Sequence, residues 1–316
     1  MESSDDGPPA ASAFLPFRAS RIVFGSCNSQ YYEQPFWEII GDRNPTAFVW
    51  TGDAIYADDR SRQSWSDNED PTPNSIIDKS RAEENARWWW LSSILKRRSR
   101  SRKISYATPE YLRQVYTKQL QVHGYRQLLQ EDNGAGGKIS IFGAIDDHDY
   151  GINNGDKTFP FRRESGVEFT KFLGLKNESS AMSRRAVKGL GVYGVQVYNF
   201  SSTTKRRLLT DAEAGLDPDV VTEHAYRDRS SDSGDDKSDQ LVAVFVLDVR
   251  SNKMPWAQTI PERFNLDPEG DFLGEHQWKW FETAIRRSTA SVNIVVSGIQ
   301  VHAPWFYDAN KIENWR

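Results

Sequence analysis

Two short polar segments contain most of the residues that could do chemistry. The first, "DDHDYG", begins at Asp146 and places three carboxylates and an imidazole in four consecutive positions. Without compensation, Asp146, Asp147 and Asp149 would repel one another, and burial would force at least one of them to take up a proton. A divalent or trivalent cation removes that cost. The segment therefore predicts a metal site, and the alternative is an exposed acidic turn.

The second segment, "GDAIYADD", begins at Gly52. Glycine lets the backbone turn sharply, so that Asp53 can present its carboxylate, and one turn of chain brings the phenol of Tyr56 near it. We interpret Asp53 and Tyr56 as metal ligands, with a polar turn and a hydrogen-bonded tyrosine as the alternative. For Asp58 and Asp59, a helix cap or a supporting contact is as consistent with the pattern as metal ligation.

Cys27 is the single cysteine of the chain, and it follows the apolar residues of "RIVFGSC". A lone cysteine is usually a small, inert core residue, but a thiolate can also bind a metal. Tyrosine ionises near pH ~10 and cysteine near ~8.5, so both must lose a proton to act as ligands. A trivalent ion achieves this most readily, which favours ferric iron at Cys27, Asp53 and Tyr56. Zinc accepts cysteine and aspartate but rarely tyrosine, and a second, harder ion could share Asp53 and use Asp147.

These residues follow apolar runs that we predict to be strands. The runs are "IVFGSC", "FVWTGDAIYADD", "ISIFGAIDDHD" and "VFVLDVR", with strands expected at 22–25, 46–50, 138–145 and 241–250, of which the first is expected to be short and buried. Four such endings indicate that the carboxyl edge of a sheet carries a site. Arg250 ends the last run, where it would contact phosphate or pair with Asp248.

The remaining elements give a mixed α and β order. Alternation predicts an antiparallel strand at 191–200, and continuous apolar runs at 241–250 and 292–301 predict strands covered on both faces. Helices are expected near 35–41, over 109–131 and over 273–287. The second of these is one helix or two helices broken at Gly124.

Composition and charge limit the class of protein. The chain has 316 residues, 38% of them hydrophobic, and a net charge of −4, which gives no global attraction to nucleic acid or membranes. We expect the basic run 96–103 to be an exposed loop and 211–239 to be a surface insertion. No apolar run approaches the roughly 20 residues of a membrane span. The N-terminus lacks signal-peptide features, so we expect cytoplasmic residence; secretion would need a start upstream of Met1.

Eight motifs in order resemble one known family. They are "FGSC", "GDxIYAD", "DDHDYGxNxG", "GVYG", "LDxR", "LGxxQWxWxxxxI", "IVxSGIQV" and "ENW". Together they resemble the PhoD-like alkaline phosphatases of the metallophosphoesterase superfamily. The resemblance implies an α/β fold, an α/β/β/α sandwich of mixed sheets over 21–316, after a flexible N-terminal segment 1–20. The family pattern continues to a late "SGDxH" segment that this sequence lacks, so we expect a C-terminally truncated chain without the last core strands.

The resemblance also implies an activity: metal-dependent hydrolysis of small-molecule phosphate monoesters or diesters, with a metal-bound oxygen as nucleophile. It implies ferric iron on Cys27, Asp53 and Tyr56, and one or more calcium ions beside it. Asp53 would bridge the metals, and Asp147 would hold the second.

Two further residues receive catalytic roles. His148 would stabilise or protonate the departing alkoxide, and Arg250 is the candidate phosphate contact. The alternative is a protein of the same fold that binds metal or a partner without turnover. Nucleic-acid binding is not expected.

Overall fold

The computed structural model describes most of the predicted elements. The described residues are 17–18, 21–58, 106–130, 138–175, 180–200, 241–255, 257–260, 263–265, 271–288 and 290–301. The basic run 96–103, the insertion 211–239 and the "ENW" motif lie outside them. Within the described part of the chain, no helix has the length and apolar character needed to cross a membrane.

One sheet contains three of the predicted strands. β2 (Ile22–Gly25), β3 (Ala47–Thr51) and β4 (Ser140–Ala144) lie in the order β2-β3-β4, and both neighbouring pairs are parallel. Parallel strands end at the same edge of a sheet, so the polar segments that follow β2, β3 and β4 begin side by side. The prediction that four strand ends meet at one edge of a sheet is confirmed for these three, and it is wrong for the fourth run, 241–250, whose strand belongs to the other sheet.

A second sheet has the order β1-β5-β6-β9. β5 pairs antiparallel with β6, as its alternation predicted, and β6 pairs parallel with β9. Phe17 and Arg18 form β1, which pairs parallel with β5. The strands outside the first sheet are β1 (Phe17–Arg18), β5 (Gly194–Asn199), β6 (Leu241–Val246), β7 (Ala257–Ile260), β8 (Arg263–Asn265) and β9 (Val292–Val296).

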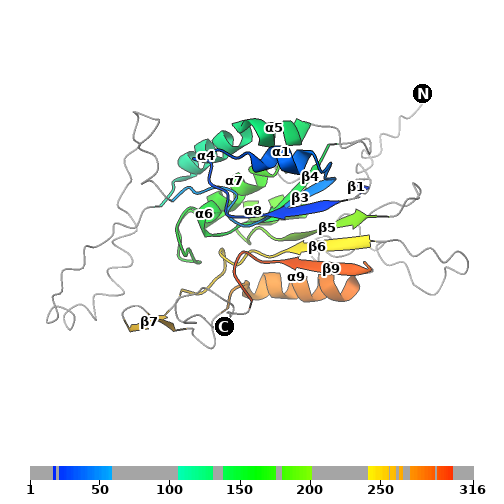
Figure 1. The fold of residues 1–316 in the computed structure, drawn as a ribbon. Coiled ribbons are helices and arrows are strands. Elements are labelled where there is room, and N and C mark those ends of the chain that lie inside the picture. The colour runs from blue at the N-terminus through cyan, green and yellow to red at the C-terminus, as the bar shows by residue number, and fades with distance from the viewer. Residues whose placement is uncertain are drawn as a thin grey trace, which may run out of the picture.

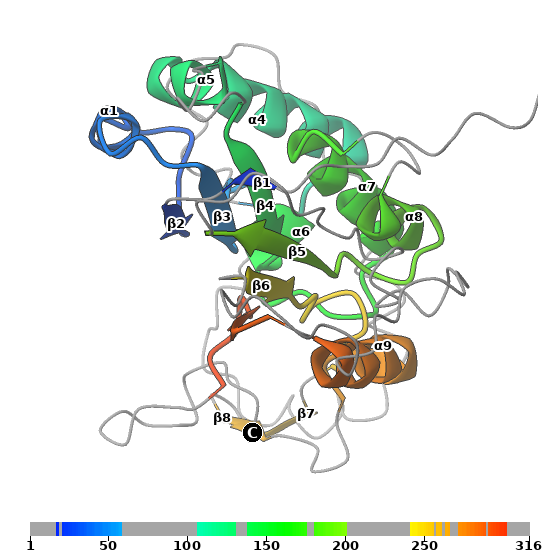
Figure 2. The same ribbon diagram turned by 90° about the vertical axis from the view of Figure 1, so that its right-hand side faces the viewer.

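Helices connect and cover the strands, which gives the mixed α/β fold that the sequence predicted (Figure 1). α4, α5 and α7 lie on the outer side of the β2-β3-β4 sheet, and α9 lies on the opposite side of the molecule, beyond β6 (Figure 2). The described helices are α1 (Phe36–Gly41), α4 (Pro109–Gln121), α5 (His123–Gln130), α6 (Asp147–Tyr150), α7 (Arg162–Phe172), α8 (Ala181–Val187) and α9 (Gly274–Arg287).

The predicted helix over 109–131 is two helices, and the break lies at Val122 rather than at Gly124. Val122 leaves the helical region with φ −55° and ψ 123°, while Gly124 lies inside α5. A Cβ atom at Gly124 would lie 2.8 Å from the Cβ of Trp37. The glycine therefore allows α5 to pack closely against α1, which is a packing requirement and not a helix break.

Aromatic side chains build the core between the first sheet and its helices. Trp37 and Trp50 are each 1% exposed and meet edge to face, with ring centroids 5.5 Å apart. Edge-to-face contact is a favoured arrangement of aromatic rings. A second core joins β6 to α9, where Phe245 and Trp280 are buried and have ring centroids 6.4 Å apart.

Two of the edge strands, β2 and β9, are more exposed than predicted. Phe24 in β2 is 41% exposed, and Val292 and Val295 in β9 are 49% and 47% exposed. The prediction of a buried strand at 22–25 and of a fully covered strand at 292–301 is therefore wrong. β2 and β9 each lie at the end of their sheet and have one neighbouring strand among the described residues. The central strand β6 is covered as expected.

Glu168 forms an ion pair that connects α4 with α7, and we expect Glu168→Gln to destabilise the fold in a pH-dependent way. Arg113 donates from Nε and Nη2 to the two carboxylate oxygens at 3.2 and 2.8 Å, and Lys171 donates at 2.9 Å. Burial raises the pKa of Glu168, but the hydrogen bonds from Arg113 and Lys171 outweigh it, so its pKa lies below the usual value.

A carboxylate whose pKa is lower in the folded state stabilises the fold at pH values above its unfolded-state pKa of about 4.3. This contribution is lost as the pH falls through the lower folded-state pKa. Arg113 is largely exposed, so we expect Glu168→Gln to cost about 1 kcal/mol at neutral pH. Urea unfolding of both proteins at about pH 7 and about pH 3 measures this. A cost that is equal at the two pH values would contradict the ion-pair explanation.

Candidate metal centre

Two predicted ligands occupy backbone conformations that side chains other than glycine rarely adopt. Asp53 has φ 51° and Cys27 has φ 55°, both in the left-handed region. Between β3 and Asp53, Gly52 has φ 109°, and a Cβ atom there would lie 2.7 Å from the Cβ of Asp146. Each left-handed residue costs of order 1 kcal/mol or more, and such conformations concentrate at functional sites. The turn after β3 is thus held against the polar segment that follows β4.

The thiol of Cys27 and the phenol of Tyr56 both lie close to the carboxylate of Asp53. Cys27 Sγ lies 3.8 Å and Tyr56 Oη 3.5 Å from the same atom, Asp53 Oδ2. Cys27 is exposed, so the alternative of an inert core thiol is wrong. Because Asp53 is buried, the three donors form a small cluster that is open on the side of Cys27.

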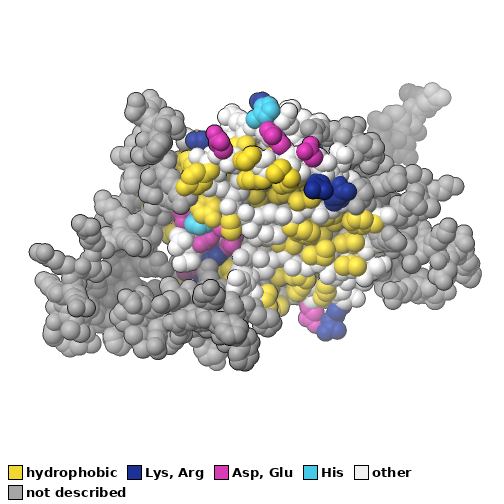
Figure 3. All heavy atoms as spheres, viewed as in Figure 1, with side chains coloured by type: hydrophobic (Ala, Val, Ile, Leu, Met, Phe, Trp, Pro, Cys, Tyr) yellow, Lys and Arg dark blue, Asp and Glu magenta, His cyan; other side chains and the backbone are white. Residues whose placement is uncertain are grey.

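Asp147 and His148 face Asp53 from the neighbouring strand end. α6 begins at Asp147, and one candidate ligand atom from each of Asp53, Asp147 and His148 lies within 4.8 Å of the other two. Asp146, Asp147 and Asp149 are 8%, 7% and 0% exposed, so the alternative of an exposed acidic turn is wrong. Figure 3 shows acidic and histidine side chains gathered at the end of the sheets where α6 lies in Figure 1.

Asp149 has a structural role beside this cluster. Its carboxylate accepts hydrogen bonds from the backbone N–H groups of Ile55 and Asp146, at 3.2 and 3.3 Å. These bonds connect the loop after β3 to the start of α6. Asp149 therefore holds together the loop after β3 and the start of α6, the two segments that contain the candidate metal ligands Asp53 and Asp147.

His148 is positioned by two residues from the loop after β3. Its Nδ1 lies 2.5 Å from Asp58 Oδ1, and its ring stacks on Tyr56 with centroids 3.9 Å apart. Burial lowers the pKa of His148, but the hydrogen bond to Asp58 and the charge of Asp147 outweigh it and raise the pKa to about 9. His148 is therefore protonated at neutral pH. The sequence left the role of Asp58 open, and the structure assigns it to holding His148.

Arg250 reaches the candidate metal centre, which consists of Cys27, Asp53, Tyr56, Asp147 and His148, from the second sheet. Its side chain is 2% exposed, Nε donates to Asp146 Oδ1 at 2.7 Å, and Nη2 lies 3.9 Å from Asp147 Oδ1. Asp248 instead accepts a hydrogen bond from the backbone N–H of Arg250, at 2.9 Å. The guanidinium also donates from Nη1 to the backbone carbonyl of Gly155 at 3.4 Å. Its carboxylate partner is Asp146, which neither sequence-based alternative for Arg250 named.

The carboxylates of the centre carry opposite pKa shifts. Burial, then Asp146 and Asp147, raise the pKa of Asp53 to about 7. Burial also acts to raise the pKa of Asp147, but Arg250 and His148 outweigh it and hold that pKa below the usual value. Burial and the neighbouring Asp53 and Cys27 raise the pKa of Tyr56. Asp53 is thus a carboxyl group at which a proton, or a cation in its place, relieves both the cost of burial and the repulsion from Asp146 and Asp147.

The residues present fit a cation. Asp53 Oδ1 is buried and accepts no hydrogen bond from the described residues, and such an atom pays a desolvation cost that a metal ion would remove. Asp53 belongs to two donor sets, one with Cys27 and Tyr56 and one with Asp147. His148 lies beside the second set, but it is protonated and its Nδ1 is engaged by Asp58, so we do not count it as a donor. Thiolate, carboxylate and phenolate donors together suit iron, and carboxylate alone suits calcium. The identity of each metal stays a prediction.

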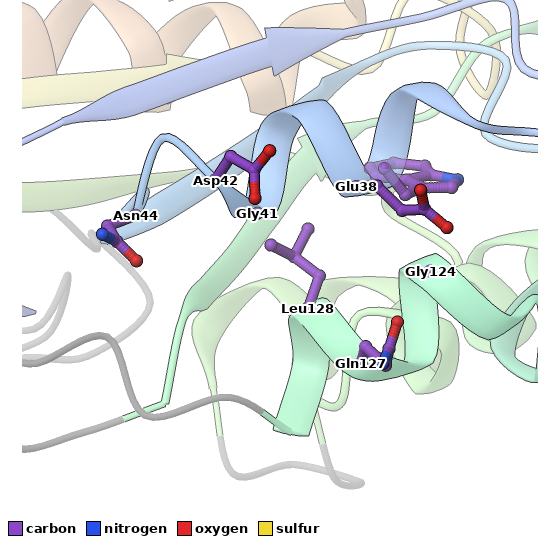
Figure 4. Close-up of a pocket in the computed structure, with 8 residues that line it drawn as sticks. Glu38, Gly41, Asp42, Asn44, Gly124, Gln127 and Leu128 are labelled. Carbon is purple, nitrogen blue, oxygen red and sulfur yellow. The ribbon is translucent and has the colours of Figure 1, made fainter.

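A separate hollow of about 390 Å³ lies between α1 and α5. Figure 4 shows Glu38 on α1 and Asp42, which directly follows α1, facing Gln127 and Leu128 on α5. It shares no residue with the centre, and we assign it no chemistry.

The functional argument therefore depends on the residues of the centre. Comparison of the chain with protein-family models, with curated proteins and with solved structures found no match.

Proposed function

We propose that the protein is a metal-dependent phosphoric ester hydrolase of the PhoD-like type. The observation that carries the proposal is Asp53, a buried carboxylate with an unpaired oxygen between two donor sets. Ferric iron would be held by Cys27, Asp53 and Tyr56, and calcium by Asp53 and Asp147. When bound, these cations supply positive charge that orients and polarises the phosphoryl oxygens. The α/β/β/α sandwich of the metallophosphoesterases belongs to the same proposal.

His148 is the proton donor in this proposal. Asp58 engages Nδ1, which leaves the other ring nitrogen to donate to the departing alkoxide oxygen. In the metal-free chain a pKa of about 9 keeps His148 protonated at neutral pH. Asp58 and the stacked ring of Tyr56 fix the direction in which the proton is presented.

Arg250 acts as a positioning residue. Its guanidinium is buried against Asp146 and close to Asp147. It thereby offsets part of the negative charge and fixes the start of α6, so that Asp147 faces Asp53. Direct contact of Arg250 with phosphate is not part of the proposal.

Metal content and ester hydrolysis test the proposal directly. The full chain is loaded with ferric iron and calcium and assayed with 4-nitrophenyl phosphate and bis(4-nitrophenyl) phosphate. We expect hydrolysis of at least one ester, lost on chelation and restored by both metals. If neither the loaded chain nor a C-terminally extended version of it hydrolyses either ester although iron is bound, the enzyme proposal is wrong and the metal-binding alternative takes its place.

We expect Cys27→Ala to remove the colour of the iron-loaded protein. A ferric ion bound by thiolate and phenolate absorbs visible light, and the variant lacks the thiolate. The measurements are the visible spectrum and the iron content per chain. Ser26→Ala is the control that keeps the thiol: it removes only the hydroxyl that donates to Cys27 Sγ at 3.5 Å, so iron and colour should be retained. An iron-replete parent protein without colour would contradict the assignment of Cys27.

A further inference from the structure

A groove of about 540 Å³ adjoins the metal centre. Cys27 and Tyr56 line it at the end next to the centre, and Phe24, Tyr32, Phe36 and Trp37 are among the residues that line the rest. Its volume lies in the range of small-molecule sites. The groove and the centre share Cys27 and Tyr56, so a molecule that reached the metal ligands could extend into the groove.

The groove is rich in aromatic rings and contains little charge. Phe24, Tyr32 and Phe36 are 41%, 60% and 40% exposed, whereas Trp37 beneath them is 1% exposed. Figure 3 shows hydrophobic side chains gathered around the position of α1 on this face. Clustered exposed apolar side chains mark ligand-binding grooves.

The charge of the groove excludes an anionic occupant. Among the described residues that line it, Glu33 is the one acidic side chain, and no lysine or arginine occurs there. A second phosphate or a polynucleotide would meet this carboxylate without a compensating cation. A neutral aromatic group would instead pack against Phe36, whose ring centroid lies 5.0 Å from that of Trp37.

We propose that this groove binds the ester group of the substrate, and that the preferred substrates are phosphate esters of large, uncharged aromatic alcohols. The proposal rests on the proposed phosphoric ester hydrolase activity. The phosphoryl group would lie at the metal centre, and the alcohol would lie along Phe24, Tyr32 and Phe36.

A pair of substrates tests the preference. Phenyl phosphate and 2-naphthyl phosphate have leaving groups of similar acidity and differ by one fused ring. We expect kcat/KM of the metal-loaded chain to be roughly tenfold higher for the naphthyl ester, because the second ring is partly buried in the open groove. Phe36→Ala and Tyr32→Ala should each reduce this ratio severalfold. Ile39→Ala is the matched control, since Ile39 is a 61% exposed residue of α1 that does not line the groove.

Binding of phosphonates that cannot be hydrolysed separates the two proposals. Calorimetry compares methylphosphonate with (2-naphthylmethyl)phosphonate, and we expect the naphthyl compound to bind roughly tenfold more tightly in a manner that depends on Phe36. Hydrolysis of phenyl phosphate without a naphthyl preference overturns the groove assignment and leaves the activity. Naphthyl-dependent binding without hydrolysis of either ester overturns the activity and leaves the groove as a binding site. Neither binding nor hydrolysis overturns both.

Discussion

Asp53→Asn is expected to abolish hydrolysis of phosphate esters and to lower the content of both metals. Asp53 is the residue that the two donor sets share, and asparagine cannot supply a negative charge to either metal. Loss of metal-derived charge stabilisation is worth several kcal/mol, so kcat/KM should fall by roughly a thousandfold or more. The assay uses the loaded chain with 4-nitrophenyl phosphate, together with elemental analysis.

Unfolding of the variant does not explain such a loss. Asparagine has nearly the same shape as aspartate and tolerates the left-handed φ of 51° at this position. In the metal-free protein the substitution also removes a buried carboxylate whose pKa is raised to about 7 by burial and by Asp146 and Asp147. We therefore expect metal-free Asp53→Asn to be at least as stable as the parent chain.

The control is a carboxylate outside the centre. Asp42 lines the hollow between α1 and α5, and Asp42→Asn should leave metal content and kcat/KM unchanged. Retention of hydrolysis within a few-fold in Asp53→Asn, with parental metal content, would show that Asp53 does not hold the metals.

The sequence predicted the location of the candidate site well, because parallel strands end at one sheet edge. Cys27, Asp53 and Asp147 follow three strands of that kind, and Tyr56 lies one turn of chain beyond Asp53. Their proximity followed from the positions of the apolar runs alone. Their roles as ligands remain predictions.

The partners of His148 and Arg250 could not be predicted in the same way. Asp58 and His148 are 90 residues apart in the chain, and Asp146 and Arg250 are 104 residues apart. Such pairs depend on side-chain direction and on how the second sheet meets the first. An apolar run followed by a charged residue does not contain that information.

The exposure of the edge strands also depends on tertiary structure. "IVFG" and "VNIVV" are as apolar as a central strand, yet β2 and β9 lie at sheet ends. β4 also lies at a sheet end, yet four of its five residues are buried. Coverage therefore depends on what packs against each strand, which is a property of the whole fold. The sequence pattern predicted the type of element correctly and its burial incorrectly.

Arg250→Met is expected to cause the largest loss of stability of any single substitution at the centre. The guanidinium is 2% exposed and donates to Asp146 at 2.7 Å, with Asp147 close by. Methionine retains much of the apolar side-chain volume but leaves the carboxylates of Asp146 and Asp147 without the buried positive charge of the guanidinium. Removing one partner of a buried ion pair typically costs about 3–5 kcal/mol. Urea unfolding of the metal-free protein at neutral pH measures this cost.

Two further variants distinguish loss of charge from loss of packing. In Arg250→Met with Asp146→Asn, one uncompensated carboxylate is removed, so part of the lost stability should return. Arg286→Met breaks the exposed pair with Glu282, whose atoms lie 3.0 Å apart on α9, and should cost under about 1 kcal/mol. If Arg250→Met costs no more than Arg286→Met, the carboxylates do not depend on Arg250 for compensation. If the double variant is as unstable as Arg250→Met alone, the loss comes from packing around the guanidinium and not from the charge of Asp146.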